Sequence, residues 1–412
     1  MSNLFWPGDE RAGDVMSEAS FLAAMVRVEE AWLAGLVASG IAPYAAKADL
    51  TGLVGPDDVE PLALASEAGG SPVIPLVSLL RKRIGESNPE AARWLHRGLT
   101  SQDVVDTALM LCCRDVVDRL DVELREQAGV LVHLVERHRS TVMAGRTLTQ
   151  HAVPITFALK ASGWLTGVLD AAEAVATARS GLAVQAGGAA GTSAATVELA
   201  RSAGLDEPVA LAMAQVGRVA AGLGLPARPP WHLARRPVTA VADAFVTATD
   251  AWGRIASDVV TLARPEIGEL AEPAVAGRGA SSTMPQKQNP VLSVLIRRAA
   301  IAAPPLAATL HTAAALALDE RPDGPWHVEW STLATLARRT VVAAAHTTEL
   351  LSGLQVDTGR MADTVAAARE SLLAEQDSIS GTTTEPADYL GSTSAVIDAA
   401  LVRARALAEE GR

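Results

Sequence analysis

The side chains best suited to chemistry lie in one loop, residues 279–290, which reads Gly-Ala-Ser-Ser-Thr-Met-Pro-Gln-Lys-Gln-Asn-Pro. It holds a hydroxyl at Ser281, a cation at Lys287 and an amide at Asn289, which could serve as a base, an electrostatic stabiliser and a hydrogen-bond donor. Glycine at one end and proline at the other predict a loop that closes over a substrate and expels water. A serine-rich surface linker is the alternative, but it does not explain the Pro-x-Lys-x-Asn-Pro spacing.

Two further polar segments interrupt the apolar sequence. In residues 99–107 the hydroxyls of Thr100 and Ser101 are expected to cap the following helix, whose free N–H groups attract an anion. A plain helix cap without a ligand is the alternative there. Residues 145–154 are dense in hydrogen-bonding side chains just before a proline that is expected to begin a helix, and this segment is either a binding site or a solvated loop.

Two segments combine tryptophan, histidine and charge beside a helix start, at residues 230–236 and 325–330. For His327 we favour packing, because a tryptophan neighbour supplies buried area and a histidine there is usually a satisfied polar group. For His232 and Arg235 the sequence leaves both readings open, packing or substrate binding.

The elements that position these segments are expected to be long helices. From residue 238 to residue 262 apolar side chains recur every three or four positions, which is typical of a helix with one buried face. Similar helices are expected at residues 17–39, 101–139, 154–179, 290–318 and 330–354, and no segment shows the alternation of a β-strand.

The predicted fold is therefore all-α. We expect an N-terminal helical domain (residues 1–97), a central long-helix bundle (98–345) that holds the catalytic loop 274–290, and a small C-terminal helical domain (346–412). A bundle of such helices has more apolar surface than one copy can cover, so several copies are expected to associate.

Composition narrows the class of protein. The chain has 412 residues, of which 49% are hydrophobic and 20% charged, and its net charge of −12 argues against a nucleic-acid partner. Cys112 and Cys113 are adjacent in an apolar stretch and are expected to be free thiols in a reducing compartment. We see no signal peptide and no unbroken apolar run of about 18 residues, so we expect a cytoplasmic protein with no membrane span. No metal and no cofactor are expected.

The run Ser-Ser-Thr-Met-Pro-Gln-Lys-Gln-Asn-Pro resembles the signature of the fumarase/aspartase superfamily, with Ala280 where the family usually has glycine. The resemblance continues through Thr-Ser-Gln-Asp at residues 100–103 and Arg-Thr at residues 146–147 to Gln150, in the family's order, so it covers most of the chain. Within the superfamily, Arg-Thr-x-x-Gln-His-Ala-x-Pro, Gly-Gly-Ala-Ala-Gly-Thr, Pro-Trp-His and Trp-His-Val-Glu-Trp are similar to the bacterial 3-carboxy-cis,cis-muconate cycloisomerases.

This resemblance implies a homotetramer whose central bundles form a many-helix core, with each active site shared between three subunits. It also implies a small polycarboxylate substrate, a proton removed α to a carboxylate, and a leaving group expelled from the β carbon. Ser281 would be the base, Lys287 would hold the substrate carboxylate, and His151 is the expected further acid. The substrate-binding residues are expected to be Thr100, Ser101, Gln102, Arg146, Thr147, Gln150, Ser282, Met284, Asn289, His232 and Arg235.

Two positions depart from the pattern of fumarase and adenylosuccinate lyase. Those enzymes carry a histidine where this chain has Leu148, and fumarase carries the partner glutamate at the position of Val294. A leaving hydroxide or amine needs a proton from such a pair, whereas a leaving carboxylate needs none.

The sequence therefore favours the cycloisomerase reaction, which converts 3-carboxy-cis,cis-muconate to 4-carboxymuconolactone in aromatic-acid breakdown. A lyase of nitrosuccinate, adenylosuccinate or another substituted succinate is the alternative of similar chemistry. A non-catalytic helical scaffold descended from the family is the alternative from another class.

Overall fold

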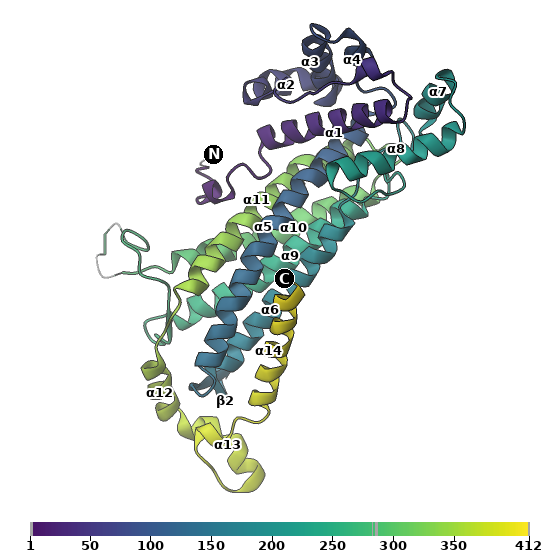
Figure 1. Ribbon diagram of the computed structural model, residues 1–412. Helices are drawn as coiled ribbons and strands as arrows, with labels where there is room; N and C mark the ends of the chain where they lie inside the picture. The colour runs from purple at the N-terminus through teal and green to yellow at the C-terminus, as the bar shows by residue number, and fades with distance from the viewer. Residues whose placement is uncertain (1–2, 282, 285–286, 411–412) are drawn as a thin grey trace. The chain divides into compact units, whose positions relative to one another are not determined.

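The computed structural model describes residues 3–281, 283–284 and 287–410, which form fourteen α-helices and four short strands (Figure 1). The predicted all-α class is confirmed, since the strands of the described residues form only two small two-stranded sheets. The chain divides into two compact units. Unit 1 contains residues 1–118, 176–243 and 305–338, and unit 2 contains residues 119–175, 244–304 and 339–412. The three-domain division stays a prediction.

Unit 1 has six helices of its own: α1 (Glu18–Ala38), α2 (Val59–Ser66), α3 (Val73–Gly85), α4 (Pro89–Trp94), α7 (Ala194–Ser202) and α8 (Pro208–Leu223). Five long helices contribute residues to both units: α5 (Ser101–Arg137), α6 (Phe157–Gly181), α9 (Arg236–Leu262), α10 (Val291–Ala315) and α11 (Gly324–Ser352). Unit 2 adds α12 (Thr358–Ala367), α13 (Arg369–Ser380) and α14 (Thr393–Glu410), with the strands β1 (Val142–Thr147), β2 (Gln150–Thr156), β3 (Leu270–Ala271) and β4 (Gln355–Val356).

In unit 1, helix α1 holds the segment that leads into α5. The helix begins where the Ser17 hydroxyl accepts the N–H of Ser20 at 3.1 Å, as expected of an N-cap serine. The buried Trp32 donates from its indole N–H to the Arg97 carbonyl at 2.7 Å. The Gln215 side chain on α8 donates to the Trp32 carbonyl at 2.9 Å, so α8, α1 and the approach to Thr100 are tied together.

In unit 2, a buried glutamine joins three of the long helices. Gln127 on α5 donates to the Ala344 carbonyl at 3.2 Å and to the Thr348 hydroxyl at 3.0 Å, both on α11. Its side-chain oxygen accepts the indole N–H of Trp252 on α9 at 2.7 Å. Figure 1 shows these three helices running alongside one another. Because the amide has partners for its oxygen and its nitrogen, it fixes the relative register of the helices without an unpaired buried polar group.

The β1–β2 hairpin corrects two sequence expectations, namely that no segment is a strand and that a helix begins at residue 154. Pro154 lies in β2, and α6 begins at Phe157, where the Thr156 hydroxyl accepts the N–H of Leu159 at 3.1 Å. Helices α12 and α13 pack on the hairpin, and their apolar contacts include Ala144 and Leu372. Burial against these helices, rather than the local pattern, explains why this segment is extended.

Helix α10 has apolar side chains that the rest of this chain does not cover. It is the one described helix long and apolar enough to cross a membrane, with mean hydropathy 1.5 and one third of that window buried, but core helices of soluble proteins pass the same test. Val294 and Ile301 are 53% and 72% exposed, and their spacing of seven places them on one helix face. The absence of a membrane span and the cytoplasmic location stay predictions.

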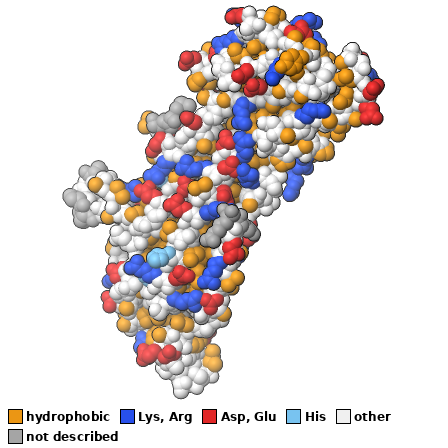
Figure 2. Space-filling view, in the orientation of Figure 1, with side chains coloured by type: hydrophobic (Ala, Val, Ile, Leu, Met, Phe, Trp, Pro, Cys, Tyr) orange, Lys and Arg blue, Asp and Glu red, His pale blue; other side chains and the backbone are white. Residues whose placement is uncertain are grey.

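Charge is mixed on the surface. Figure 2 shows acidic and basic side chains interspersed on the visible face.

The thiols of Cys112 and Cys113 are free and buried, and burial raises the pKa of Cys112 to about 12, which keeps that thiol protonated.

The close approach of α9 and α10 gives a stability prediction. A Cβ at Gly253 would lie 2.6 Å from the Cβ of Ala300, so Gly253→Ala should destabilise the protein by about 1–3 kcal/mol through overpacking. Gly129 on α5 has open space around it, so Gly129→Ala is the matched control and should stabilise by about 0.5–1 kcal/mol. Urea unfolding measures both; equal effects of the two substitutions would contradict the close packing.

Candidate active site

The N-terminus of α5 is held by Asp103, whose side chain is fully buried. Its carboxylate accepts the backbone N–H of Thr100 at 2.9 Å, which caps the first turn. The same carboxylate accepts the N–H groups of Gly187 and Gly188 at 3.1 and 2.9 Å. The Thr100 hydroxyl, expected to cap this helix, instead accepts a hydrogen bond from Arg321 at 3.0 Å. Asp103 thus fixes Thr100 against the glycine-rich segment.

Gln102 and His232, both expected to bind substrate, lie beside Asp103 in the interior of unit 1. Gln102 donates from its amide to the His232 carbonyl at 3.0 Å. The imidazole of His232 is 4% exposed, and its Nε2 lies 2.9 Å from the Gln185 amide nitrogen and 3.3 Å from Asp103 Oδ1. Gln185 was not predicted to belong to this group, because it is distant in sequence from His232 and Asp103.

Arg235 is fully occupied by protein carboxylates. Its guanidinium, 2% exposed, donates to Asp106 at 2.6 and 3.0 Å and to Glu329 at 3.1 and 2.5 Å. Burial raises the pKa of Glu329, while its contact with Arg235 opposes that rise. Burial by itself lowers the pKa of Arg235, but the two carboxylates outweigh it and raise the pKa above its ordinary value. This geometry gives Arg235 a positioning role, and substrate binding by Arg235 stays a prediction.

A cation that was not among the predicted site residues, Arg321, lies next to Thr100. The Arg321 guanidinium is 5.4 Å from the ring centroid of Trp326 as well as hydrogen-bonded to the Thr100 hydroxyl. Trp326 is itself fixed, because its indole N–H donates to Asp106 at 2.9 Å. Unit 1 therefore presents an ordered arginine beside the α5 N-terminus.

Four expected site residues lie on the β1–β2 hairpin of unit 2: Arg146, Thr147, Gln150 and His151. Arg146 donates two hydrogen bonds, at 2.9 and 2.7 Å, to the fully buried Glu269. The other three side chains are exposed near the hairpin turn. The turn residues Leu148 and Thr149 both have positive φ, at 48° and 71°, as a type I′ hairpin turn requires.

The hydroxyl of Ser281 accepts hydrogen bonds from its own loop in unit 2. Its Oγ accepts the backbone N–H groups of Thr283 and Met284 at 3.4 and 3.2 Å. Hydrogen bonds donated to an oxygen stabilise its negatively charged form, so this contact favours a deprotonated hydroxyl. Ser281 is half-buried and Met284 is 43% exposed. Ser282, also expected to bind substrate, lies outside the described residues.

Asn289 and Lys287 flank the other end of this loop. The Asn289 backbone and side-chain N–H groups both donate to the Gly279 carbonyl at 2.9 Å, and Ala280 forms a β-bridge with Gln288. Lys287 is exposed, and its backbone N–H donates to the Met284 carbonyl at 3.1 Å.

The expected site residues therefore fall into two groups. Unit 1 brings together Thr100, Ser101, Gln102, His232 and Arg235, and unit 2 holds the hairpin and loop residues. Asp103 had a signal in the sequence, since a carboxylate three residues after a hydroxyl is the capping-box spacing. The partners Glu269 and Glu329 had none, because they are distant in sequence from the arginines they bind.

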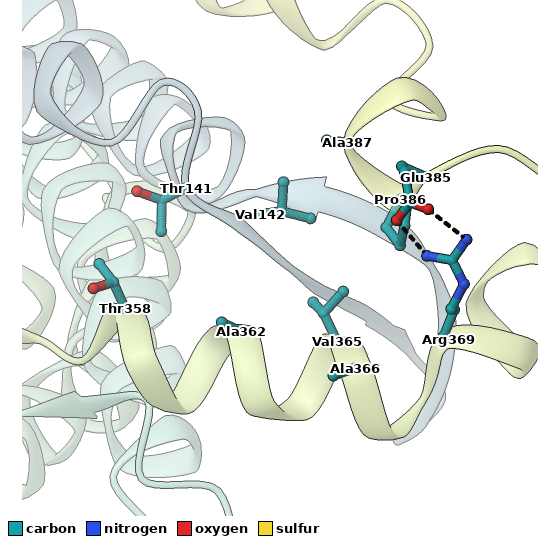
Figure 3. Close-up of a pocket in the computed structure, with 10 residues that line it drawn as sticks. All are labelled: Thr141, Val142, Thr358, Ala362, Val365, Ala366, Arg369, Glu385, Pro386 and Ala387. Carbon is teal, nitrogen blue, oxygen red and sulfur yellow. Dashed lines mark hydrogen bonds and ion pairs between the residues drawn. The ribbon is translucent and has the colours of Figure 1, made fainter.

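One pocket of unit 2 contains none of the expected site residues (Figure 3). It measures about 520 Å³ and is lined mainly by apolar side chains from α12 and the start of β1. Its arginine, Arg369, is paired with Glu385 at 2.5 and 3.0 Å, as the dashed lines show. The pocket therefore offers a polycarboxylate no uncommitted cation among the side chains drawn.

Comparisons with known proteins agree on one family. The family model described as Lyase matches residues 71–303. Nitrosuccinate lyase of Streptomyces davaonensis is 45% identical over 350 residues, covering 84% of this chain and 73% of that protein. The 3-carboxy-cis,cis-muconate cycloisomerase of Bradyrhizobium diazoefficiens is 38% identical over 369 residues, covering 87% and 77%.

Solved structures agree. The 3-carboxy-cis,cis-muconate lactonizing enzyme of Pseudomonas putida matches with a TM-score of 0.83 and 28% identity, covering 96% of this chain and 97% of that one. A fumarate lyase from Mesorhizobium matches with a TM-score of 0.78 and 26% identity, covering 95% and 97%. The family match extends over more than half of the chain and includes the Ser281 loop, so the chain belongs to the fumarase/aspartase superfamily and is an enzyme of that superfamily.

Proposed function

We propose that this enzyme expels a stable anion from the carbon β to a carboxylate, with Ser281 removing the proton from the α carbon. The observation that supports this most is the pair of backbone N–H groups donated to Ser281 Oγ. A serine hydroxyl is a weak base until its deprotonated form is stabilised, and the two donated N–H groups contribute to that stabilisation together with the Lys287 ammonium.

Lys287 and Asn289 supply the charge that the reaction needs. The proton is only weakly acidic until the carboxylate beside it is neutralised, so an ammonium and an amide N–H lower the barrier by stabilising the dianion. The Asn289 amide has two N–H donors, one of which is used by the Gly279 carbonyl. The other remains for a substrate carboxylate.

The leaving group is inferred from two apolar residues. Leu148 is 95% exposed at the hairpin turn and Val294 is 53% exposed on α10, where fumarase has its histidine and glutamate. An anion that is stable without a proton, such as nitrite or a carboxylate, leaves without help from such a pair.

Nitrosuccinate is the first candidate substrate, because the nitrosuccinate lyase relative is 45% identical whereas the cycloisomerase relative is 38% identical. In that reaction the C–H bond breaks and Ser281 takes the proton, the C–N bond breaks and nitrite leaves with the electron pair, and fumarate forms. The second candidate is the cycloisomerase reaction, which the structural match to the lactonizing enzyme favours. In that lactonising direction the same steps run in reverse: a substrate carboxylate oxygen adds to the β carbon, and Ser281 gives a proton to the α carbon.

We also propose a homotetramer with shared active sites. The support is the apolar face of α10, on which Val294 and Ile301 are largely uncovered. Exposed apolar patches of this kind mark association surfaces, and closed symmetric assembly covers them.

Turnover should distinguish the candidate substrates. With nitrosuccinate we expect fumarate and nitrite in equal amounts, measured by separate assays of each product. With carboxymuconate, loss of the diene absorbance would support the second candidate. Adenylosuccinate should give no fumarate, because an amine leaving group requires a proton donor. Adenylosuccinate turnover together with inactive nitrosuccinate and carboxymuconate would contradict the proposal.

Replacing the base should remove catalysis without unfolding the enzyme. Ser281→Ala should lower kcat about 100- to 10,000-fold on the accepted substrate, the usual effect of losing a general base. Ser78→Ala removes an exposed hydroxyl on α3 and serves as the control, with a rate close to that of the parent. A Ser281→Ala rate equal to the control's would show that another group takes the proton.

Assembly should depend on α10. Light scattering is expected to report a tetramer for the parent chain and a smaller species for Ile301→Glu, because the substitution places a charge in the proposed interface. Ile379→Glu changes an equally exposed isoleucine on α13, 77% exposed, and should leave the tetramer intact. A monomeric parent chain would refute the assembly.

A further inference from the structure

Glu272 joins the two ends of the segment that carries the catalytic loop. It directly follows β3, which pairs with β4 through Leu270 and Ala271. Its carboxylate accepts the backbone N–H groups of Leu292 and Ser293 at 3.0 and 2.7 Å, in the first turn of α10. These N–H groups have no partner inside their own helix, and a carboxylate at a helix N-terminus is favoured by the helix dipole.

A second set of contacts lies further along the same segment. Gly279 has φ of 73°, and a Cβ there would lie 2.6 Å from the Asn289 carbonyl oxygen, so the backbone at Gly279 and the backbone at Asn289 approach closely. The Gly279 carbonyl accepts both N–H groups of Asn289, and Arg278 forms an ion pair with Glu349 on α11. Ser281 and Lys287 lie just beyond these contacts.

We propose that Glu272 is a positioning residue, which sets the geometry of Ser281, Lys287 and Asn289 by clamping the first turn of α10 to the end of β3. Asn289 precedes that turn by only a few residues, so the position of its amide follows the position of α10. The effect of Glu272 on catalysis rests on the proposed function of the loop. The clamp between α10 and β3 does not depend on that function.

The clamp predicts greater exposure of the loop to protease when the carboxylate is removed. Trypsin cleaves after lysine, and Lys287 is exposed. In the full-length enzyme, Glu272→Ala should speed cleavage at Lys287–Gln288 about tenfold, because local opening becomes more frequent. Glu272→Gln keeps the side-chain length and one acceptor oxygen, so it should lie between the parent and Glu272→Ala. Mass spectrometry of the fragments identifies the cleaved bond.

Asp357→Ala is the matched control. Asp357 is also a carboxylate that caps a helix of unit 2, accepting the Arg360 N–H at 2.9 Å at the start of α12. Loss of this carboxylate should destabilise the protein, as the loss of any helix cap does. Cleavage at Lys287 should stay at the parent rate. A faster cleavage in this control would show general loosening rather than a clamp.

Kinetics test the catalytic part on whichever substrate the enzyme accepts. We expect Glu272→Ala to lower kcat about tenfold with a smaller change in KM, because misplacing catalytic groups costs rate more than binding. Cleavage at the parent rate in both Glu272 variants would overturn the clamp, and unchanged kcat with faster cleavage would overturn the positioning role. Cleavage is measured without substrate, so failure of the clamp and failure of the proposed function are distinguishable.

Discussion

The contact of two backbone N–H groups with the Ser281 hydroxyl is the interaction on which the proposed chemistry depends. A serine is a poor base, and only a setting that favours its alkoxide makes it useful. In the proposed mechanism the loop backbone supplies part of that setting, through the N–H groups of Thr283 and Met284. The backbone can donate these hydrogen bonds only if the loop keeps its local conformation. The contacts at Gly279 and the hydrogen bonds to the Glu272 carboxylate hold that conformation.

Many of the other polar side chains of the predicted site are buried and bind protein groups, so they hold the surrounding segments in place. In unit 1, Asp103 and Asp106 are fully buried and collect hydrogen bonds from two loops and from Arg235 and Trp326. Removing one partner of such a network leaves a buried charge unsatisfied, which costs more than the interaction itself contributes. Arg321 differs, because it is an exposed residue whose guanidinium contacts Trp326 and Thr100.

The sequence was informative where a periodic pattern decided the structure. The helix expected at residues 238–262 is α9, Arg236–Leu262, and the helix expected at residues 101–139 is α5, Ser101–Arg137, because an apolar stripe of that length admits few alternatives. It failed at Pro154, where packing by α12 and α13 produces a strand instead of a helix start.

Some contacts of the candidate site could not be predicted from the sequence, because they join residues that are far apart in the chain. The pairing of Arg146 with Glu269 joins residues 123 positions apart, and neither residue carries a local signal of it. Ser281, Lys287 and Asn289 could be predicted as site residues because they fall within one short motif, whereas their supports at Glu272 and Glu349 lie outside it. The substrate could not be predicted from the sequence, because leaving-group chemistry alone does not separate nitrite from a carboxylate.

The most direct test of the central claim is a crystal structure of the enzyme with fumarate bound. The account predicts that Ser281 Oγ lies within about 3.5 Å of a fumarate carbon, as a proton transfer between them requires, with Lys287 at the adjacent carboxylate. A structure in which another side chain is closest to that carbon, and the Ser281 hydroxyl points into solvent, would contradict it.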